Sequence, residues 1–338
     1  MTKVLISGYY GFDNFGDEAV LGILLNKLKG CDITVLTSDP RKTFNTYGVH
    51  CVNSFSQKVI NEILKCDVLI SGGGSLLQNA TSDASLIYYS SIIKMAQIAR
   101  KKVIIFAQGI GPITGFWQTW GTKRILKKCN YISVRDEDSL NLLKSWGIKN
   151  ANLVCDPVYS LPVKQMEHSS RIGLQLRKYN TLTDNLFDNI VSQVKSRYFT
   201  RDIELISLED NMDVGISEVF MNKLKYVDPK INVKIIKGLT QDEKIRHIAS
   251  LDCLIGMRFH ACLIAIKHGV KTLAINYDPK VENLAKSAGI PMLDMDNKKN
   301  DYYKAFDDME NLSRWNLMDW AKSQQFGWAN TGINEIIK

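Results

Sequence analysis

The sequence predicts an α/β protein built from two Rossmann-like parallel-sheet domains that face each other across a cleft. Short apolar strands alternate with amphipathic helices, the alternation breaks at a loop-like stretch near residues 160–170, and it then starts again. The 338 residues also exceed what one hydrophobic core fills comfortably. We therefore expect an N-terminal domain at 1–165, a C-terminal domain at 170–300 and a helical segment at 301–338.

The first domain is predicted from short runs of Val, Ile and Leu, most of which end beside a Gly, Ser or Asp residue. These runs predict strands at 3–7, 33–37, 68–71, 103–108, 131–134 and 152–155. Apolar residues at helical spacing predict helices at 17–29, 56–64, 83–100, 118–128 and 136–146. Because helices separate the strands, the strands should run parallel, with helices on both faces of the sheet.

The second domain repeats this pattern after the loop-like stretch. Strands are predicted at 171–176, 203–207, 233–236, 252–255 and 271–275, with helices between them. The tail at 301–338 is rich in Trp and looks wholly helical. We expect the tail to pack on the outside of the molecule, where it can also cross back to the first domain.

The chain carries 43 Lys and Arg residues against 35 Asp and Glu residues, a formal net charge of +8. This excess favours anionic partners such as phosphorylated metabolites or anionic lipid headgroups. The positive residues are spread along the chain without a long basic run, so the sequence does not favour nucleic acid as a partner.

The seven cysteines stand singly, with no C-x-x-C pair and no cluster at metal-ligand spacing. We interpret them as small core residues of a protein in a reducing compartment, and we expect no metal. The N-terminus shows no signal-peptide pattern, and no apolar stretch approaches the roughly 18 residues of a membrane span. We expect a cytoplasmic protein whose basic surface can touch the inner face of the membrane.

Two glycine-rich loops follow strands of the first domain. Residues 8–18 contain three glycines, which let a ligand approach the backbone closely, and Asn14 and Asp17 supply polar groups where a helix begins. Residues 72–74 are consecutive glycines, and Gly73 and Gly74 are candidates for a nest of backbone N–H groups. Neither loop matches a dinucleotide-binding or P-loop pattern. A simple turn with Asp17 as the helix cap is the alternative interpretation.

In the second domain, Arg258 and His260 follow the apolar run at 251–255 and precede a helix-like run. Open α/β sheets bind ligands at such strand ends, and a helix N-terminus favours anions. An arginine offers a planar fork for a carboxylate or phosphate, and a histidine can move a proton near neutral pH. The alternative is a helix-capping arginine and a core histidine.

Three further cations stand at predicted strand ends: Arg135 after 131–134, Arg177 after 171–176, and Lys280 after 271–275. Taken singly, each is more often a solvated charge, and Arg135 could pair with Asp136 or Asp138. Their shared placement beside Arg258 favours an anion site.

Five motifs in one order carry a resemblance to a known family. They are Gly8-Tyr-Tyr-Gly with Asn14-Phe-Gly-Asp17, Gly72-Gly-Gly-Ser-Leu-Leu77, Gln108-Gly-Ile-Gly-Pro112, Ser133-Val-Arg-Asp136 and Gly256-Met-Arg-Phe-His260-Ala. Over about residues 4–293 the chain resembles the polysaccharide pyruvyl transferase family, and most closely the members that ketalise secondary cell-wall polymers used to anchor S-layer proteins. It departs from the family pattern at Phe259, where a smaller aliphatic residue is usual, and at Lys271, where proline is common.

The resemblance implies a fold like that of the GT-B glycosyltransferases, with phosphoenolpyruvate as the donor and no metal. The acceptor it implies is a sugar 4,6-diol, often N-acetylmannosamine of a lipid-linked precursor, and the products are a 4,6-pyruvate ketal and phosphate. Carried over by motif, Arg258 and His260 fall on donor-binding and catalytic positions, and Arg135, Lys280 and the loop with Asp13, Asn14 and Asp17 fall on other functional positions. Together with their placement, this predicts a donor set of Arg135, Arg177, Arg258 and Lys280 and an acceptor set of Asp13, Asn14, Asp17, Gly73 and Gly74.

Two other functions stay open from the sequence. A GT-B glycosyltransferase that uses a sugar nucleotide would have the same architecture, because one fold hosts many chemistries. A non-catalytic protein that binds an anion or a glycan would also use such cations and glycine loops. Phosphate release from phosphoenolpyruvate would separate these possibilities.

Overall fold

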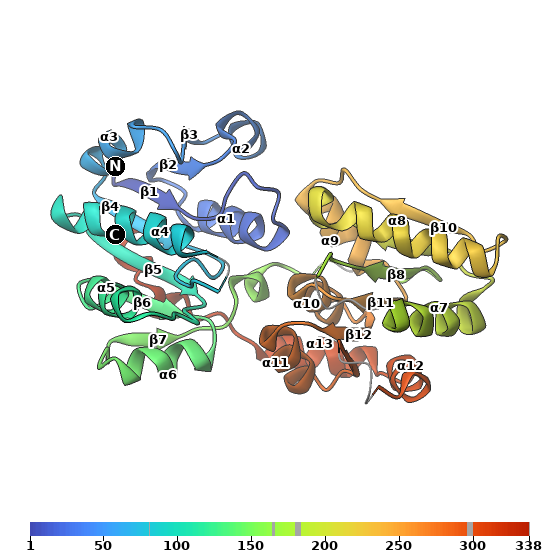
Figure 1. Ribbon diagram of the computed structural model, residues 1–338. Coiled ribbons are helices and arrows are strands. Elements are labelled where there is room, and N and C mark those ends of the chain that lie inside the picture. The colour runs from blue at the N-terminus through green and yellow to red at the C-terminus, as the bar shows by residue number, and fades with distance from the viewer. Residues whose placement is uncertain (81, 164–165, 180–183, 296–299, 338) are drawn as a thin grey trace. The chain divides into compact units, whose positions relative to one another are not determined.

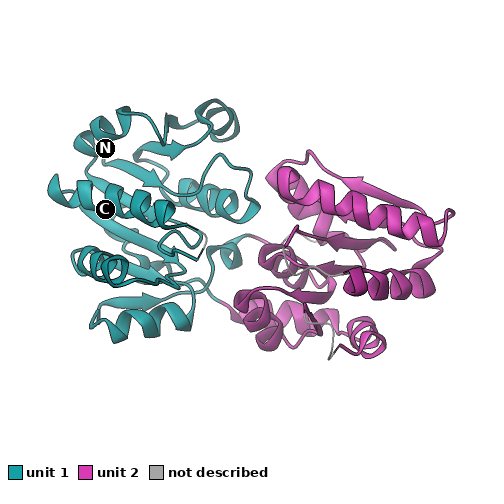
Figure 2. Cartoon of the chain, in the orientation of Figure 1, with its two compact units in different colours: residues 1–161, 325–338 teal, residues 162–324 magenta. Residues whose placement is uncertain are grey.

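The computed structural model describes residues 1–80, 82–163, 166–179, 184–295 and 300–337 (Figure 1). The chain divides into two compact units: unit 1 contains residues 1–161 and 325–338, and unit 2 contains residues 162–324 (Figure 2). Each unit has its own parallel sheet flanked by helices. This confirms the predicted fold class of two parallel-sheet α/β domains.

In unit 1, seven described strands form one sheet in the order β3-β2-β1-β4-β5-β6-β7. The strands are β1 (Lys3–Ser7), β2 (Asp32–Thr37), β3 (His50–Asn53), β4 (Val68–Gly72), β5 (Lys102–Gln108), β6 (Tyr131–Val134) and β7 (Ala151–Leu153). The helices are α1 (Phe15–Lys27), α2 (Pro40–Tyr47), α3 (Lys58–Lys65), α4 (Asp83–Ile98), α5 (Phe116–Leu126) and α6 (Glu137–Ser145). The strand order reverses direction between β1 and β4, and open parallel sheets bind ligands outside the carboxyl ends of strands at such a switch point.

In unit 2, six described strands form the second sheet in the order β10-β9-β8-β11-β12-β13. The strands are β8 (Ile172–Gln175), β9 (Ile203–Ile206), β10 (Val233–Ile236), β11 (Cys253–Gly256), β12 (Lys271–Asn276) and β13 (Met292–Asp294). The helices are α7 (Asp184–Tyr198), α8 (Asp210–Val227), α9 (Gln241–Ala249), α10 (Phe259–Lys267), α11 (Pro279–Ala288), α12 (Tyr302–Glu310) and α13 (Arg314–Ser323). The switch point of this sheet lies between β8 and β11, where Leu174 pairs with Ile255.

Apolar strands buried on both faces form the core of each unit. In unit 1, Leu69 of β4 and Ile105 of β5 are fully buried against Ile92 of α4. In unit 2, Leu174 of β8 and Ile255 of β11 are buried in a second hydrophobic core. Each such side chain contributes about 1.5–3 kcal/mol through its burial. No helix within the described residues is both long enough and apolar enough to cross a membrane.

Four of the elements named above were not predicted from the sequence: α2, β3, α11 and β13. Helix α2 is largely polar, but Asp39 caps it by accepting a hydrogen bond from the Lys42 backbone N–H at 3.0 Å, and Pro40 opens its first turn. β3 (His-Cys-Val-Asn) and β13 (Met-Leu-Asp) each contain only two consecutive apolar residues, which is too few to indicate a strand. The strand predicted at 152–155 ends earlier, at Leu153.

The tail predicted as wholly helical divides between the two units. Helices α12 and α13 belong to unit 2, residues 324–327 are not helical, and residues 325–338 belong to unit 1. There, Phe326 and Trp328 pack against the buried ring of Phe106 in β5, with ring centroids 5.7 and 5.9 Å away. A 3₁₀ turn (Trp328–Thr331) and a short helix α14 (Asn334–Ile337) follow.

Candidate functional site

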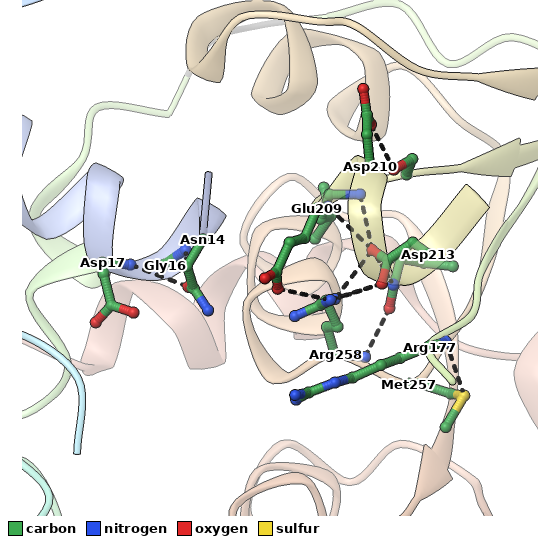
Figure 3. A network of polar contacts seen from close by, with 12 residues as sticks. Asn14, Gly16, Asp17, Arg177, Glu209, Asp210, Asp213, Met257 and Arg258 are labelled. Atoms are coloured by element: carbon green, nitrogen blue, oxygen red, sulfur yellow. Dashed lines mark hydrogen bonds and ion pairs between the residues drawn. The ribbon is translucent and has the colours of Figure 1, made fainter. Parts of the chain in front are cut away.

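The candidate site of unit 2 lies at the carboxyl edge of its sheet, where β8 and β11 end side by side. Gly256 at the end of β11 pairs with Gln175 at the end of β8. Hydrogen bonds join the residues that follow, since the Arg258 backbone N–H donates to Gln175 Oε1 at 2.7 Å. The Arg177 backbone N–H donates to Met257 Sδ at 3.3 Å (Figure 3). The strand order therefore brings Arg177 and Arg258 to one edge.

The turn between β11 and α10 consists of Met257 and Arg258, with Arg258 at the N-cap position in an extended conformation (φ −74°, ψ 132°). Its side chain makes no capping hydrogen bond among the described residues. Helix α10 starts so close to the strand that a Cβ at Gly256 would lie 2.8 Å from Cys262 Sγ. Arg258 thus occupies the N-cap position of α10, but its guanidinium does not bind the helix N-terminus.

The guanidinium of Arg258 is buried between two carboxylates of the β9–α8 segment (Figure 3). Its Nε donates to both oxygens of Asp213 at 3.1 and 3.0 Å, and its Nη2 lies 2.6 Å from Asp213 Oδ1 and 2.9 Å from Glu209 Oε2. Burial alone would lower the pKa of Arg258, but Asp213 and then Glu209 outweigh it and raise the pKa. Arg258 is therefore a fixed cation.

Asp213 is itself held in place by donors at the start of α8. Its Oδ2 accepts hydrogen bonds from the backbone N–H groups of Leu208 at 3.0 Å and Glu209 at 3.1 Å, and from Gln175 Nε2 at 3.2 Å. A helix N-terminus stabilises a carboxylate. Removing one partner of a buried pair costs about 3–5 kcal/mol, so Asp213 fixes the position of Arg258 strongly.

Two guanidinium nitrogens at this edge have no hydrogen-bond partner within the described residues. They are Nη1 of Arg258 and the buried Nε of Arg177. Arg177 lies over the Tyr277 ring, 5.9 Å from its centroid, and both arginine side chains extend to the same side of the network (Figure 3). Burial raises the pKa of Tyr277, and the Arg177 cation opposes that rise. Two such donors suit a carboxylate or a phosphate.

His260 and Lys280 lie at the same edge, each in the first turn of a helix. His260 is the second residue of α10, and its half-buried ring meets Phe259 edge-on at 5.0 Å. Lys280 belongs to α11, and its backbone N–H donates to the helix cap Asp278 at 2.8 Å. The structure thus gathers Arg177, Arg258, His260 and Lys280 at one edge of unit 2.

The candidate site of unit 1 lies at the carboxyl ends of β1 and β4. Asn14 caps α1 by accepting hydrogen bonds from the backbone N–H groups of Gly16 at 3.1 Å and Asp17 at 3.3 Å (Figure 3). The interpretation of Asp17 as the cap is wrong, because Asp17 lies in the first turn, where it is buried. Gly74 rests on Asp17 with φ +59°, and a Cβ on Gly74 would lie 2.3 Å from Asp17 Oδ1.

Further contacts join the two glycine loops of unit 1. The buried Tyr10 hydroxyl donates to the Gly72 carbonyl at 2.8 Å. Gly73 also has a positive φ (+81°) and faces Val20 of α1. Asp13 differs from its neighbours, because its side chain is exposed and pairs with Lys42 of α2. The adjacency of β1 and β4 therefore brings Asn14, Asp17, Gly73 and Gly74 together, with Asp13 at the solvent side.

Arg135 is paired within unit 1 with Asp156, a partner that the sequence did not point to. Nη1 lies 2.9 Å from Asp156 Oδ2, and Nη2 donates to Ser75 Oγ at 3.2 Å. Asp136, the next residue, caps α6. Arg135 ties the end of β6 to the loop that continues the three glycines, and its predicted role in donor binding stays a prediction.

Sequence reasoning missed the carboxylates that complete these networks: Asp213 and Glu209 in unit 2, and Asp156 in unit 1. Each of these carboxylates lies in a helix or loop far along the chain from the arginine that it contacts, so no local pattern indicated its role. Gln175 did carry a signal, because a fully buried amide at the end of an apolar strand needs partners. Within the described residues, no group of three or more His, Cys, Asp or Glu side chains is arranged to hold a metal ion.

A comparison with protein families covers most of both candidate sites, leaving out Asp13 and Lys280. The model of the family described as polysaccharide pyruvyl transferase matches residues 14–279, from Asn14 in unit 1 to the start of α11 in unit 2. The chain belongs to the polysaccharide pyruvyl transferase family. The family match shows pyruvyl transfer to polysaccharide in general terms, and it includes Arg258 and His260. No curated protein sequence matches the chain of this pyruvyl transferase.

Solved structures resemble this pyruvyl transferase in fold over nearly its whole length. UDP-GlcNAc 2-epimerase from Methanocaldococcus jannaschii has a TM-score of 0.66 at 14% identity and covers 99% of this chain and 98% of its own. Anabaena Alr3699/HepE in complex with UDP and glucose has a TM-score of 0.63 at 9% identity, with 100% and 97% covered. UDP-GlcNAc 2-epimerase from Neisseria meningitidis bound to UDP-GlcNAc has a TM-score of 0.63 at 11% identity, with 100% and 98% covered. At these identities the likeness shows the fold alone, which is GT-B-like.

Proposed function

We propose that this chain transfers the pyruvyl group of phosphoenolpyruvate to a sugar 4,6-diol, giving a 4,6-pyruvate ketal and phosphate. Family membership supports pyruvyl transfer, and the donor, the acceptor and the ketal chemistry are our proposal. As acceptor we propose N-acetylmannosamine of a lipid-linked precursor of a cell-wall polymer that anchors S-layer proteins. The reaction would then take place at the cytoplasmic face of the membrane.

The observation that carries this proposal is that, among the described residues, one guanidinium nitrogen of Arg177 and one of Arg258 have no hydrogen-bond partner. Phosphoenolpyruvate carries a carboxylate and a phosphate, and a phosphate group holds about 1.5–2 negative charges near neutral pH. Asp213 and Glu209 already offset the charge of Arg258. Arg177 and Lys280 therefore supply the positive charge that remains for the donor, and Arg258 supplies a rigid, oriented donor group.

The proposed reaction needs one proton on the donor's methylene carbon. His260 would deliver that proton, converting CH₂ to CH₃ and leaving a positive centre at C2. One sugar hydroxyl attacks C2 and loses its proton. The C2–O bond to phosphate then breaks, and the second hydroxyl attacks C2 to close the ring. The proton of this second hydroxyl is released with the departing phosphate. Proton transfer by a positioned side chain is worth about 10²–10⁴ in rate.

Unit 1 suits a sugar, because its glycine loops expose backbone without side chains. We propose that the loops at Gly73 and Gly74 bind the acceptor through backbone groups. Asp17 lies against this loop, as the close approach of Gly74 to its carboxylate indicates, and Asn14 caps the helix that carries Asp17. Asp13 is the acceptor-binding candidate with a solvent-exposed carboxylate.

Phosphate release is the decisive measurement. The protein is incubated with phosphoenolpyruvate and a panel of lipid-linked disaccharides, and the product is checked for the added mass of pyruvic acid less water. Release that depends on an acceptor with free 4- and 6-hydroxyls supports the proposal. Turnover of a UDP-sugar instead would indicate a glycosyltransferase, and donor binding without any release would indicate a binding protein. Full activity in the presence of a chelator is expected, because we propose that side chains alone offset the donor's charge.

A further inference from the structure

Three exposed aromatic residues stand together at the start of α5 in unit 1. Phe116, Trp117 and Trp120 are 74%, 73% and 48% exposed. Their rings meet edge-on, with centroids 5.3 Å apart for Phe116–Trp117 and 6.2 Å apart for Trp117–Trp120. A grouped set of large exposed apolar side chains marks an interaction surface more often than scattered ones do.

The same helix continues with cations, and the surrounding sequence contains no acidic residue. Residues 84–135 include nine basic residues and no Asp or Glu, so this segment alone exceeds the formal net charge of +8 of the whole chain. These residues are Lys94, Arg100, Lys101, Lys102, Lys123, Arg124, Lys127, Lys128 and Arg135. The basic residues are spread along the chain, but the net positive charge is concentrated in this segment because acidic residues are absent from it.

The packing of α5 turns both groups outward. Thr122 and Leu126 are buried, and Gln97 of α4 donates from Nε2 to the Ile125 carbonyl at 2.8 Å, which fixes the inner side of α5. Trp120 and Arg124, one turn apart, stack with the guanidinium 5.2 Å from the ring centroid. The outer side of α5 is therefore aromatic in its first turns and cationic in its last turns.

We propose that the outer side of α5 binds the surface of a bilayer containing anionic phospholipids. Trp and Phe side chains prefer the boundary between headgroups and acyl chains, and Lys and Arg are attracted to anionic headgroups. Apart from Arg135, which is buried and paired with Asp156, the cations of this segment have no acidic residue beside them in the sequence and provide the charge complementarity for such a surface. The occupant is the lipid surface, because the aromatic rings would enter it while Lys123, Arg124, Lys127 and Lys128 meet its phosphates.

The aromatic end of α5 lies at the same edge of the sheet as the glycine loops. Helix α5 follows the carboxyl end of β5, and the Thr114 backbone N–H just before it donates to Asn79 Oδ1 at 2.8 Å in the segment after β4. A membrane-bound α5 would therefore hold the loops at Gly73 and Gly74 near the headgroups. This last step rests on the proposed function, whereas binding to the bilayer does not.

Vesicle binding tests the inference without donor or acceptor. The full chain is mixed with vesicles of phosphatidylcholine and phosphatidylglycerol in equal parts, or of phosphatidylcholine alone, and bound protein is measured by flotation. We expect binding to the anionic vesicles, a blue shift of tryptophan emission, and weakening by salt. Replacing Phe116, Trp117 and Trp120 by Ser, or Lys123, Arg124, Lys127 and Lys128 by Gln, should each weaken binding at least about tenfold.

Matched control variants come from unit 2. Trp315→Ser removes an aromatic residue that is 69% exposed, and replacing Lys225, Lys230, Lys237 and Lys286 by Gln removes four exposed charges. Both should bind vesicles like the wild type. The inference is overturned if the wild type does not bind anionic vesicles, or if the α5 variants bind them as well as the controls do. It is also overturned if the aromatic variant abolishes a dimer seen by sedimentation, or if duplex DNA displaces the protein from the vesicles. Circular dichroism confirms that each variant is folded, and failure of pyruvyl transfer would leave the vesicle result unchanged.

Discussion

Arg258 carries one positive charge and contacts two carboxylates, since Asp213 and Glu209 lie 2.6 and 2.9 Å from its Nη2. The two carboxylates hold its guanidinium in one orientation, and they also reduce its net attraction for an anion. In the described part of the chain, Arg177 pairs with no carboxylate, and its buried Nε makes no hydrogen bond. We therefore expect Arg258 to orient the donor and Arg177 to contribute more of its electrostatic affinity.

Arg258→Lys keeps the charge but loses the planar fork. A lysine cannot bind Asp213 and Glu209 while also offering a second oriented donor nitrogen, so the affinity for phosphoenolpyruvate should fall at least about tenfold. Calorimetric titration with the donor measures this. Arg246→Lys, in the exposed pair with Asp242 on α9, is the control. Equal donor affinity in wild type and variant would make Arg258 a structural residue.

His260→Ala removes the proposed proton donor while leaving the helix intact. Turnover should fall by about 10²–10⁴-fold, because that is the usual contribution of a positioned acid or base. Donor affinity should change much less, which a binding titration checks. His50→Ala, at an exposed position of β3, should retain wild-type turnover. A folded His260→Ala protein with near wild-type turnover would contradict the proposed role.

The sequence predicted the cations of unit 2 but not the carboxylates that hold them. Arg258 and His260 are recognisable because they follow a strand and precede a helix. Asp213 lies 45 positions from Arg258, and it reaches the guanidinium because β9 and β11 both neighbour β8. That adjacency is a property of strand order, which no local pattern around Asp213 records. The partner of Arg135 was missed for the same reason.

At the scale of elements, the loop after β4 rests directly on the first turn of α1. Gly74 adopts φ +59°, a left-handed conformation, and no space remains above Asp17 for a Cβ. The loop and the helix therefore form one assembly in which backbone atoms, rather than side chains, are exposed to a ligand. A side chain at this position should disturb both stability and acceptor binding.

Gly74→Ala should lower the free energy of unfolding by more than backbone strain alone, which is roughly 1–2 kcal/mol, because the Cβ also meets Asp17 Oδ1. Urea unfolding measures the loss, and the Michaelis constant for the acceptor should rise. Gly48→Ala is the matched control, since its φ is +68° and nothing lies within 4 Å of the added Cβ.

A double variant isolates the contact between the loop and the helix. With Asp17→Ala in the background, Gly74→Ala should cost no more than Gly48→Ala, because the obstructing carboxylate is gone. If the cost of Gly74→Ala is unchanged in that background, the contact with Asp17 is not its cause.

The sequence also predicted the elements unevenly. All eleven strands that were predicted are present, because strands buried on both faces read as continuous apolar runs. Elements at the margins were missed: β3 and β13 are short edge strands, and α2 is polar on most of its surface. The wholly helical tail was wrong because Phe326 and Trp328 pack on Phe106, a tertiary contact that overrides local helical preference.

At the scale of the whole molecule, unit 2 carries a charge network at the edge opposite its candidate site. Glu204 is fully buried in β9 and lies 2.7 Å from His247 Nε2, 3.0 Å from Arg171 Nη1 and 3.1 Å from Lys234 Nζ. Burial alone would raise the pKa of Glu204, but hydrogen bonds from His247 and Lys234 outweigh it and hold the pKa at about 2. Its ordinary pKa is about 4.3.

The lowered pKa of Glu204 predicts a defined loss of stability in acid. A depressed pKa contributes stability that is complete above the unfolded value of about 4.3 and is lost as pH falls toward about 2. Glu204→Gln should be less stable than the wild type at pH 6, and the difference should shrink between these two values. Urea unfolding across this range measures it. Glu218→Gln, at an exposed position of α8, should leave the slope of stability against pH unchanged.

Because residues 325–338 return to unit 1, unit 1 cannot be completed until the end of the chain has been translated. The ring of Tyr131 in β6 would lie 2.4 Å from a Cβ on Gly332, so this segment sits tightly against the strand. On the ribosome, residues 1–161 emerge well before this segment, and all of unit 2 is translated in between. The nascent unit 1 must therefore expose Phe106 and its neighbours until unit 2 has been synthesised, which makes that face a binding site for chaperones during translation.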